Sequence, residues 1–109
     1  MKKLRPRVRA LKLAKEVRQR LTKELGSPVK VVMFGSQARG DATKESDIDL
    51  LVIVPAVDTQ IRKKISGITW EIGLDAGKVI CAIPTTKEKM KQDSFLPFYK
   101  NVKREGVVA

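Results

Sequence analysis

The sequence predicts an α/β (α+β) fold: a small mixed β-sheet with helices packed mainly on one face, in the order α-β-β-α-β-α. Apolar residues recur every three or four positions in residues 8–25 and again in 57–73, which is typical of amphipathic helices. Three short apolar runs, 29–34, 47–54 and 78–83, are rich in β-branched residues and are typical of strands. The connections between these elements are short, so we expect the helices to pack directly against the sheet.

Length and charge limit what the chain can be. Its 109 residues, 42% of them hydrophobic, are the size of one domain, so we expect residues 1–109 to form a single unit. The formal net charge is +11, and residues 1–25 hold ten Lys or Arg against two Glu, a balance of +8. Such a basic amphipathic helix favours anionic partners, namely nucleic acid, nucleotides or an acidic protein surface. A solvated, lysine-rich helix face is the plainer interpretation.

The rare residue types exclude several kinds of site. There is no His and a single Cys, so the sequence argues against a zinc site or a Cys–His nucleophile. Cys81 lies in an apolar run, and we expect it to be a small buried core residue. No continuous apolar segment follows the basic first residues, and no apolar run is long enough to span a membrane. We therefore expect a cytoplasmic protein.

The first helix and the first two strands follow directly from the pattern. The helix ends at Gly26, and its apolar stripe consists of Val8, Leu11, Ala14, Val17, Leu21 and Leu25. Strand 29–34 leads into a polar loop, 35–45, with a helical turn at 37–39. A loop of about a dozen residues is too short for a packed crossover helix. We therefore expect strands 29–34 and 47–54 to be antiparallel neighbours.

The second helix is predicted over residues 57–73. Its stripe consists of Val57, Ile61, Ile65, Ile68 and Ile72. Trp70 lies off this stripe and could flank the core or mark a partner surface, of which we favour the edge of the core. Residues 75–77 should turn the chain into strand 78–83, which Pro84 should close.

The C-terminal part should hold two further helices. A short helix over residues 87–92 should begin after a threonine cap, Thr85 or Thr86. Ser94 should cap the last helix, 95–105, which tolerates a proline in its first turn and ends at Gly106. Residues 107–108 should add a short edge strand.

Two acidic residues interrupt the second strand where an apolar surface would be expected. Residues two apart in a strand point to the same face, so Asp47 and Asp49 direct their carboxylates to one place while Ile48 points into apolar packing. Two neighbouring carboxylates repel each other, and a hard divalent cation relieves that repulsion. Mg²⁺ often binds through one or two carboxylates together with substrate phosphates. The pair therefore predicts a Mg²⁺ site to which a nucleotide would bind.

The turn after the first strand supplies groups for phosphate. Gly35 and Ser36 place backbone N–H groups and a hydroxyl at the end of the strand, where a phosphate can approach. Arg39 can form a bidentate pair with phosphate, and Gly40 turns the loop back toward the aspartates. Ser46 completes the predicted phosphate-binding set. Each part alone has a plain structural interpretation, namely a turn, a solvated arginine or a cap, but the combination with the two aspartates favours a nucleotide site.

The stretches "GSQARG" and "SDIDLLV" together resemble the nucleotidyltransferase superfamily of the DNA polymerase β type. Within it, the chain resembles in particular the minimal nucleotidyltransferases. The resemblance covers nearly the whole sequence, and the closing "PFYKNVKREGVV" resembles the tail of these small proteins. It implies the nucleotidyltransferase fold for this chain.

The resemblance also implies an activity. These enzymes transfer a nucleoside monophosphate, here expected to be AMP from ATP, to a hydroxyl acceptor. In that scheme Asp47 and Asp49 bind two Mg²⁺ ions, while Gly35 and Ser36 hold the triphosphate. Minimal nucleotidyltransferases resemble the antitoxin half of toxin–antitoxin pairs, so a HEPN-type helical protein is the implied partner and acceptor.

The sequence departs from the family pattern at one point. The family adds a third carboxylate from the next core strand, but residues 78–83 contain no acid, and we expect Glu71 and Asp75 to lie on the preceding helix and turn. Two interpretations stay open: an enzyme that uses two aspartates, or a catalytically weak or inactive subunit that binds nucleotide and partner. A nucleic-acid-binding module led by the basic helix is a third, although the few aromatic residues offer no stacking platform.

Overall fold

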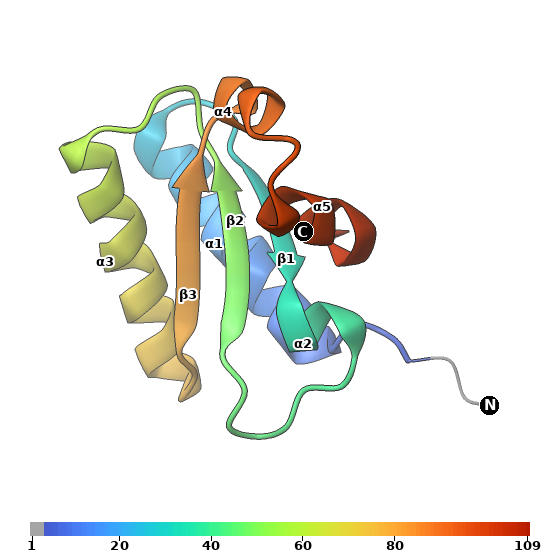
Figure 1. Cartoon of the computed structure of the whole chain (residues 1–109). Helices are drawn as coiled ribbons and strands as arrows, with labels where there is room; N and C mark the ends of the chain where they lie inside the picture. The colour runs from blue at the N-terminus through green and yellow to red at the C-terminus, as the bar shows by residue number, and fades with distance from the viewer. Residues whose placement is uncertain (1–3) are drawn as a thin grey trace.

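The structure is a computed structural model that describes residues 4–109, and it confirms the predicted mixed α/β architecture (Figure 1). A four-stranded sheet has the order β3-β2-β1-β4. The elements in chain order are α1 (Val8–Leu25), β1 (Lys30–Phe34), α2 (Gly35–Arg39), β2 (Ile48–Ile53), α3 (Thr59–Ala76), β3 (Ile80–Thr85), α4 (Lys87–Gln92), α5 (Pro97–Glu105) and β4 (Val107–Val108). Of the predicted basic helix, residues 1–3 lie outside the described residues, and residues 4–7 precede α1 without helical structure.

The strand pairing confirms the predicted hairpin. β1 and β2 are antiparallel neighbours, and their register places Phe34 opposite Asp49. α3 forms the crossover between β2 and β3, which are parallel. β4 pairs antiparallel with the other side of β1, which confirms the short edge strand predicted for residues 107–108. The start of β2 and the end of β1 therefore meet at one end of the sheet.

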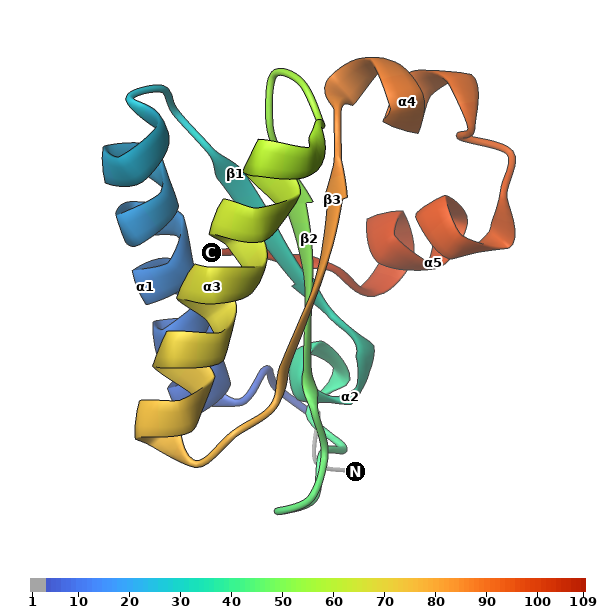
Figure 2. The same ribbon diagram turned by 90° about the vertical axis from the view of Figure 1, so that its left-hand side faces the viewer.

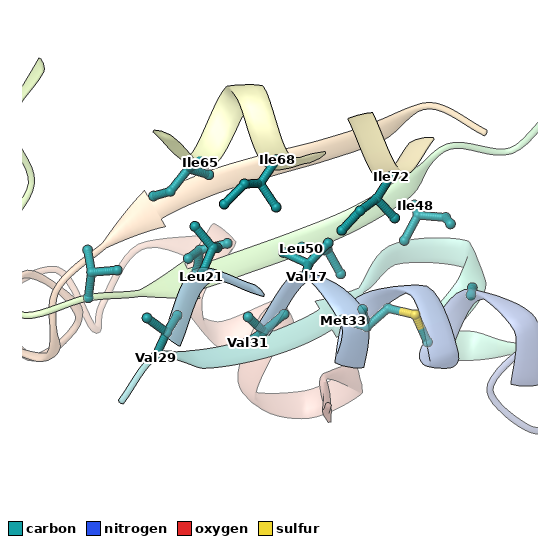
Figure 3. Close-up of a cluster of buried hydrophobic side chains, with 14 of the residues drawn as sticks. Val17, Leu21, Val29, Val31, Met33, Ile48, Leu50, Ile65, Ile68 and Ile72 are labelled. Carbon is teal, nitrogen blue, oxygen red and sulfur yellow. The ribbon is translucent and has the colours of Figure 1, made fainter. Parts of the chain in front are cut away.

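The main core lies between the sheet and the pair α1 and α3, which cover one face (Figure 2). Its side chains are almost all aliphatic (Figure 3). They include Val17 and Leu21 from α1, Ile65, Ile68 and Ile72 from α3, and Val31, Met33, Ile48 and Leu50 from the sheet. Burial of each such side chain contributes roughly 1.5–3 kcal/mol. This layer fixes β1 and β2 and so holds their ends in place.

The opposite face of the sheet is covered only in part, by α5 (Figure 2). Val102 of α5 is buried there, and the ring of Phe98 meets the rings of Phe34 and Tyr99 edge to face at 5.4 and 5.1 Å. The Tyr99 hydroxyl also lies 2.8 Å from the hydroxyl of Thr85, which is 1% exposed. These contacts fix α5 over β1 and leave the part of the face over β3 open.

The open face explains one wrong prediction, which concerns Cys81. Cys81 is exposed rather than buried. It lies on the edge strand β3 and points to the same face of the sheet as α5, but α5 does not extend as far as β3. Cys81 lies in an apolar stretch, but no element among residues 4–109 covers it. Trp70, which was predicted at the core edge, is 68% exposed and lines a groove between α3 and β3 together with Leu74 and Ile80.

The boundaries around α3 and β3 also differ from the prediction. α3 begins after Asp58, whose Oδ1 accepts the N–H of Ile61 at 2.8 Å, and it continues to Ala76, so Gly77 alone makes the left-handed turn. Pro84 does not close β3. The N–H of Val54 donates to the carbonyl of Thr85, so the pairing with β2 continues past the proline. The nitrogen of Pro84 faces the free edge of β3, where no hydrogen-bond donor is needed.

The last part of the chain follows the prediction with one change. Thr86 caps α4 by accepting the N–H of Lys89 at 3.0 Å, as expected. Ser94 does not cap α5, which begins at Pro97 after Leu96, because a proline at the first helical position needs no partner for an N–H. Among residues 4–109, no helix has both the length and the apolar character needed to cross a membrane.

Candidate active site

The predicted site residues from the first two strands meet at one end of the sheet, below β1 and β2 in Figure 1. β1 ends at Phe34 and turns directly into the short helix α2, which begins at Gly35. Because Phe34 is paired with Asp49, the backbone of Gly35 comes to lie beside that carboxylate. The hairpin register is thus what brings the Gly-Ser turn and the aspartates together.

Gly35 cannot be replaced by another residue without a shift of its backbone or of the Asp49 side chain. Its φ of 74° lies in the left-handed region that disfavours side chains. A Cβ at this position would also collide with Oδ2 of Asp49. The sequence predicted that this glycine permits close approach, and the structure shows that the approaching group is the Asp49 carboxylate.

The two aspartates differ in their surroundings. Asp47 is exposed just before β2, whereas Asp49 is half-buried within it, and Ile48 between them is buried in the core as predicted. Burial raises the pKa of the Asp49 carboxyl above its ordinary value, and the negative charges of Asp47 and Glu105 raise it further, while Arg39 lowers it. The ionised form of Asp49 is therefore disfavoured in the metal-free site, and a bound cation would stabilise it.

The sequence did not single out Glu105, which contacts both the Gly35 turn and Arg39. Oε1 of Glu105, at the end of α5, accepts the N–H of Gly35 at 3.1 Å. Nη1 of Arg39 donates to both carboxylate oxygens of Glu105, at 3.3 and 3.2 Å, and Nε of Arg39 donates to Asp41 at 3.4 Å. Glu105 lies 70 positions from Gly35, and the only signal in the sequence was the resemblance of the C-terminal tail to the family.

Cys81 occupies the position beside the aspartates on the next strand. β3 places it in register with Asp49, and its thiol donates to Oδ2 of Asp47 at 3.7 Å. Burial raises the pKa of the Cys81 thiol, and the charges of the two aspartates raise it further. No acid stands at this position, as the sequence indicated. Glu71 lies on α3, where it pairs with Arg20 at 2.7 Å.

The other predicted residues shape the loop between α2 and β2. Oγ of Ser46 accepts the N–H of Thr43 at 2.9 Å, and its carbonyl accepts Nε2 of the buried Gln37 at 3.2 Å. Gly40 ends α2 with a φ of 89°, and its Cα packs against the backbone of Arg5 with no room for a Cβ. Ser46 and Gly40 thus hold the loop in place, with Gln37 as a support that the sequence did not single out.

The donor groups present fit one hard divalent cation. Asp47 and Asp49 provide carboxylate oxygens, and Mg²⁺ commonly takes one or two such ligands together with substrate phosphates and water. The raised pKa of Asp49 is in keeping with a site that is completed by a cation. Among residues 4–109, no cluster of three or more His, Cys, Asp or Glu side chains could hold a metal ion. Any ion here would therefore need further oxygen ligands, from water or from a substrate phosphate.

Comparison with known proteins agrees with this geometry. The family model described as a nucleotidyltransferase domain matches residues 12–108. A protein of Methanocaldococcus jannaschii, named as a candidate protein adenylyltransferase, is 39% identical over 87 residues, which cover 80% of this chain and 83% of that protein. A bifunctional uridylyltransferase/uridylyl-removing enzyme of Burkholderia orbicola is 32% identical over 89 residues, which cover 75% of this chain but only 10% of that enzyme.

A solved structure adds support for the fold. A candidate nucleotidyltransferase from Sulfolobus solfataricus superposes with a TM-score of 0.62 over 93% of this chain and 79% of the other, at 23% identity. At that identity the likeness concerns the fold alone, whereas the family model and the relative from M. jannaschii extend it to the sequence. The chain therefore belongs to the nucleotidyltransferase domain family and is a nucleotidyltransferase.

Proposed function

We propose that this protein transfers AMP from ATP, with Mg²⁺, to a hydroxyl group on a partner protein. The observation that carries the proposal is the meeting of the Gly35 turn and Arg39 with Asp47 and Asp49 at one end of the sheet. AMP and a protein acceptor are supported by the name of the M. jannaschii relative, a candidate protein adenylyltransferase. The uridylyltransferase relatives support nucleotidyl transfer in general.

In this proposal the α2 turn holds the triphosphate. The N–H of Gly35 and the hydroxyl of Ser36 donate to phosphate oxygens, and the guanidinium of Arg39 forms a charge-assisted pair with them. Gly40 and Ser46, which fix the loop, keep these donors at the end of β1. The turn therefore orients the α-phosphorus toward the aspartates.

Asp47 and Asp49 would hold one Mg²⁺ ion, or two as in related enzymes, in contact with the same phosphates. When bound, Mg²⁺ neutralises charge on the phosphates and favours an in-line displacement. The acceptor oxygen forms the new bond to the α-phosphorus, and the bond from that phosphorus to the pyrophosphate oxygen breaks. The hydroxyl proton passes to water on the exposed side of Asp47. The open face over β3 leaves room for the acceptor to approach.

We further propose that the acceptor is a HEPN-type helical protein and that the two form a toxin–antitoxin pair in the cytoplasm. The resemblance of the motif to minimal nucleotidyltransferases supports this pairing, as does the net charge of +11, which suits an acidic partner surface. Residues 1–109 would then act as one catalytic domain. Nucleoside triphosphates are available in that compartment.

A second candidate is a catalytically weak or inactive subunit that binds nucleotide and partner. The observation that favours it is Cys81, because a thiol stands on β3 beside Asp49 where related enzymes provide a carboxylate. A basic nucleic-acid-binding module is a third candidate and rests on the basic residues of α1. Its affinity would have to fall steeply with salt.

The test is transfer of label from [α-³²P]ATP, with Mg²⁺, to the product of the neighbouring gene. We expect the partner to become labelled, and Asp47→Asn or Asp49→Asn to lower the rate by more than about a hundredfold. Asp75→Asn, which removes an exposed acid on α3, is the matched control and should keep the rate. Tight ATP binding without label transfer would instead support the inactive subunit. Salt-sensitive RNA binding alone would support the third candidate.

A further inference from the structure

The carboxylate of Glu105 occupies the groups that the proposed function assigns to phosphate. It accepts the Gly35 N–H at 3.1 Å and two contacts from Nη1 of Arg39 at 3.3 and 3.2 Å. The Glu105 side chain is only 15% exposed. Carboxylate and phosphate oxygens accept the same charge-assisted hydrogen bonds from amides and guanidinium groups. Glu105 therefore stands where a bound anion would stand.

Little capacity remains for a second anion at the Gly35 amide, and Arg39 beside it is already paired with carboxylates. Nε of Arg39 already donates to Asp41 at 3.4 Å, so carboxylates lie on two sides of the guanidinium. The hydrogen bonds to Glu105 and then Asp41 raise the pKa of Arg39, which stays fully charged. The backbone N–H of Gly35 can form one well-aligned hydrogen bond, and Glu105 accepts it. A phosphate that accepts the Gly35 N–H therefore has to take the place of Glu105.

Electrostatic repulsion leads to the same conclusion. Glu105 accepts the N–H of Gly35 at 3.1 Å and the Asp49 carboxylate packs on the same glycine, so both carboxylates act on the same small region. A triphosphate would bring several more negative charges to it. Because like charges in a partly buried site repel strongly, Glu105 and the triphosphate should not share the Gly35 amide.

The backbone around Glu105 is fixed, so its carboxylate can leave the site only through a rotation of the side chain. Val102, one turn earlier in α5, is 5% exposed, and Gly106 packs so closely on Val102 and Val32 that a Cβ has no room. The strand that follows pairs with β1. Glu105 is also the last residue of α5, where the helix dipole disfavours a negative charge. Its present conformation is therefore held by its partners rather than by the helix.

We propose that Glu105 is an internal competitor of the triphosphate. Its carboxylate closes the phosphate site in the ligand-free protein, and nucleotide binding displaces it through a rotation of the side chain. This inference rests on the proposed function for the assignment of Gly35 and Arg39 to phosphate. Its consequence is selectivity, because a polyphosphate can replace the carboxylate more readily than a single phosphate group can.

Calorimetric titration of sodium tripolyphosphate and of ATP in metal-free buffer tests the proposal. We expect Glu105→Gln and Glu105→Ala to bind both ligands about five- to tenfold more tightly than the unmodified protein. That factor corresponds to a binding-competent state that is a minor fraction of the ligand-free protein. Glu24→Gln removes the same charge from an exposed position in the last turn of α1 and should leave the affinity unchanged.

Unchanged or weaker binding by Glu105→Gln would overturn the proposal, since Glu105 would then only orient Arg39. If Glu105→Ala fails to fold by circular dichroism, Glu105→Gln decides, because it keeps the size of the side chain. The label-transfer assay separates this inference from the proposed function. A gain in affinity without transfer by any variant contradicts the transfer activity alone, whereas transfer without a gain contradicts the competitor alone.

Discussion

The carboxylate of Asp49 lies directly over the backbone of Gly35, with no space between them for a methyl group. The contact joins the two halves of the site, because one residue belongs to the turn after β1 and the other to β2. It also depends on the hairpin register, which pairs Phe34 with Asp49. A shift of that register by one residue would send Asp49 to the opposite face of the sheet.

Gly35→Ala should therefore destabilise the protein by about 1–3 kcal/mol, through the left-handed backbone and the collision with Asp49. Urea unfolding monitored by circular dichroism measures the change. Gly67→Ala is the matched control, because Gly67 lies in α3 with open space around it, and alanine should stabilise the helix there by roughly 0.5–1 kcal/mol. Equal effects at the two positions would contradict the close contact at Gly35.

The pH dependence of stability should report on Asp49. Its pKa in the folded, metal-free protein is raised, first by burial and then by Asp47, so folding favours the protonated form. The stabilisation is present below the unfolded pKa near 3.8 and is lost as the pH rises through the folded pKa. Urea unfolding with EDTA should show the wild-type protein losing stability relative to Asp49→Asn as the pH rises from 4 toward neutrality. Parallel pH profiles would contradict the raised pKa.

The pairing of Asp49 with Cys81 leads to a prediction about metal affinity. Cys81→Asp should place a third carboxylate beside Asp47, and it should tighten Mg²⁺ binding by roughly tenfold because the number of carboxylates sets affinity at hard-cation sites. Without metal, the same substitution should lower the melting temperature through repulsion. Calorimetry measures the first effect and thermal denaturation the second.

Cys81→Ser is the control for that substitution. It preserves size without adding charge and should change neither the Mg²⁺ affinity nor the melting temperature appreciably. If Cys81→Asp bound Mg²⁺ no more tightly than Cys81→Ser, the β3 position would not face the ion.

The hydrogen bond between Tyr99 and Thr85 should matter for stability because Thr85 is buried. Tyr99→Phe leaves the Thr85 hydroxyl without this partner, and we expect a loss of about 1–2 kcal/mol in urea unfolding. Adding Thr85→Val to Tyr99→Phe should restore part of the loss, because no unpaired hydroxyl remains. Strictly additive losses would indicate that the two hydroxyls do not depend on each other.

The features that the sequence predicted are those set by local periodicity. Ile48 and Asp49 face opposite sides of β2 because a strand alternates, and the loop from Gly35 to Glu45 is too short for anything but a hairpin. The helix α1 follows from its regular apolar stripe. Each of these predictions needs only neighbouring residues.

The features that the sequence did not predict depend on contacts between distant segments. Glu105 reaches Gly35 only because Val102 and β4 fix the end of α5 against β1. Cys81 was assigned to the core because its neighbours are apolar, but its exposure depends on how far α5 extends over the sheet. Periodicity along one strand does not say which of its faces another element will cover.

The exposed thiol of Cys81 gives the protein a natural reporter position. It is the single cysteine of the chain and lies 3.7 Å from Asp47, so a small fluorinated tag attached there would sit at the edge of the site without any engineered substitution. Because its pKa is raised by burial and by the aspartates, labelling should proceed faster at alkaline pH. The ¹⁹F resonance of such a tag could then follow cation and nucleotide binding as separate events.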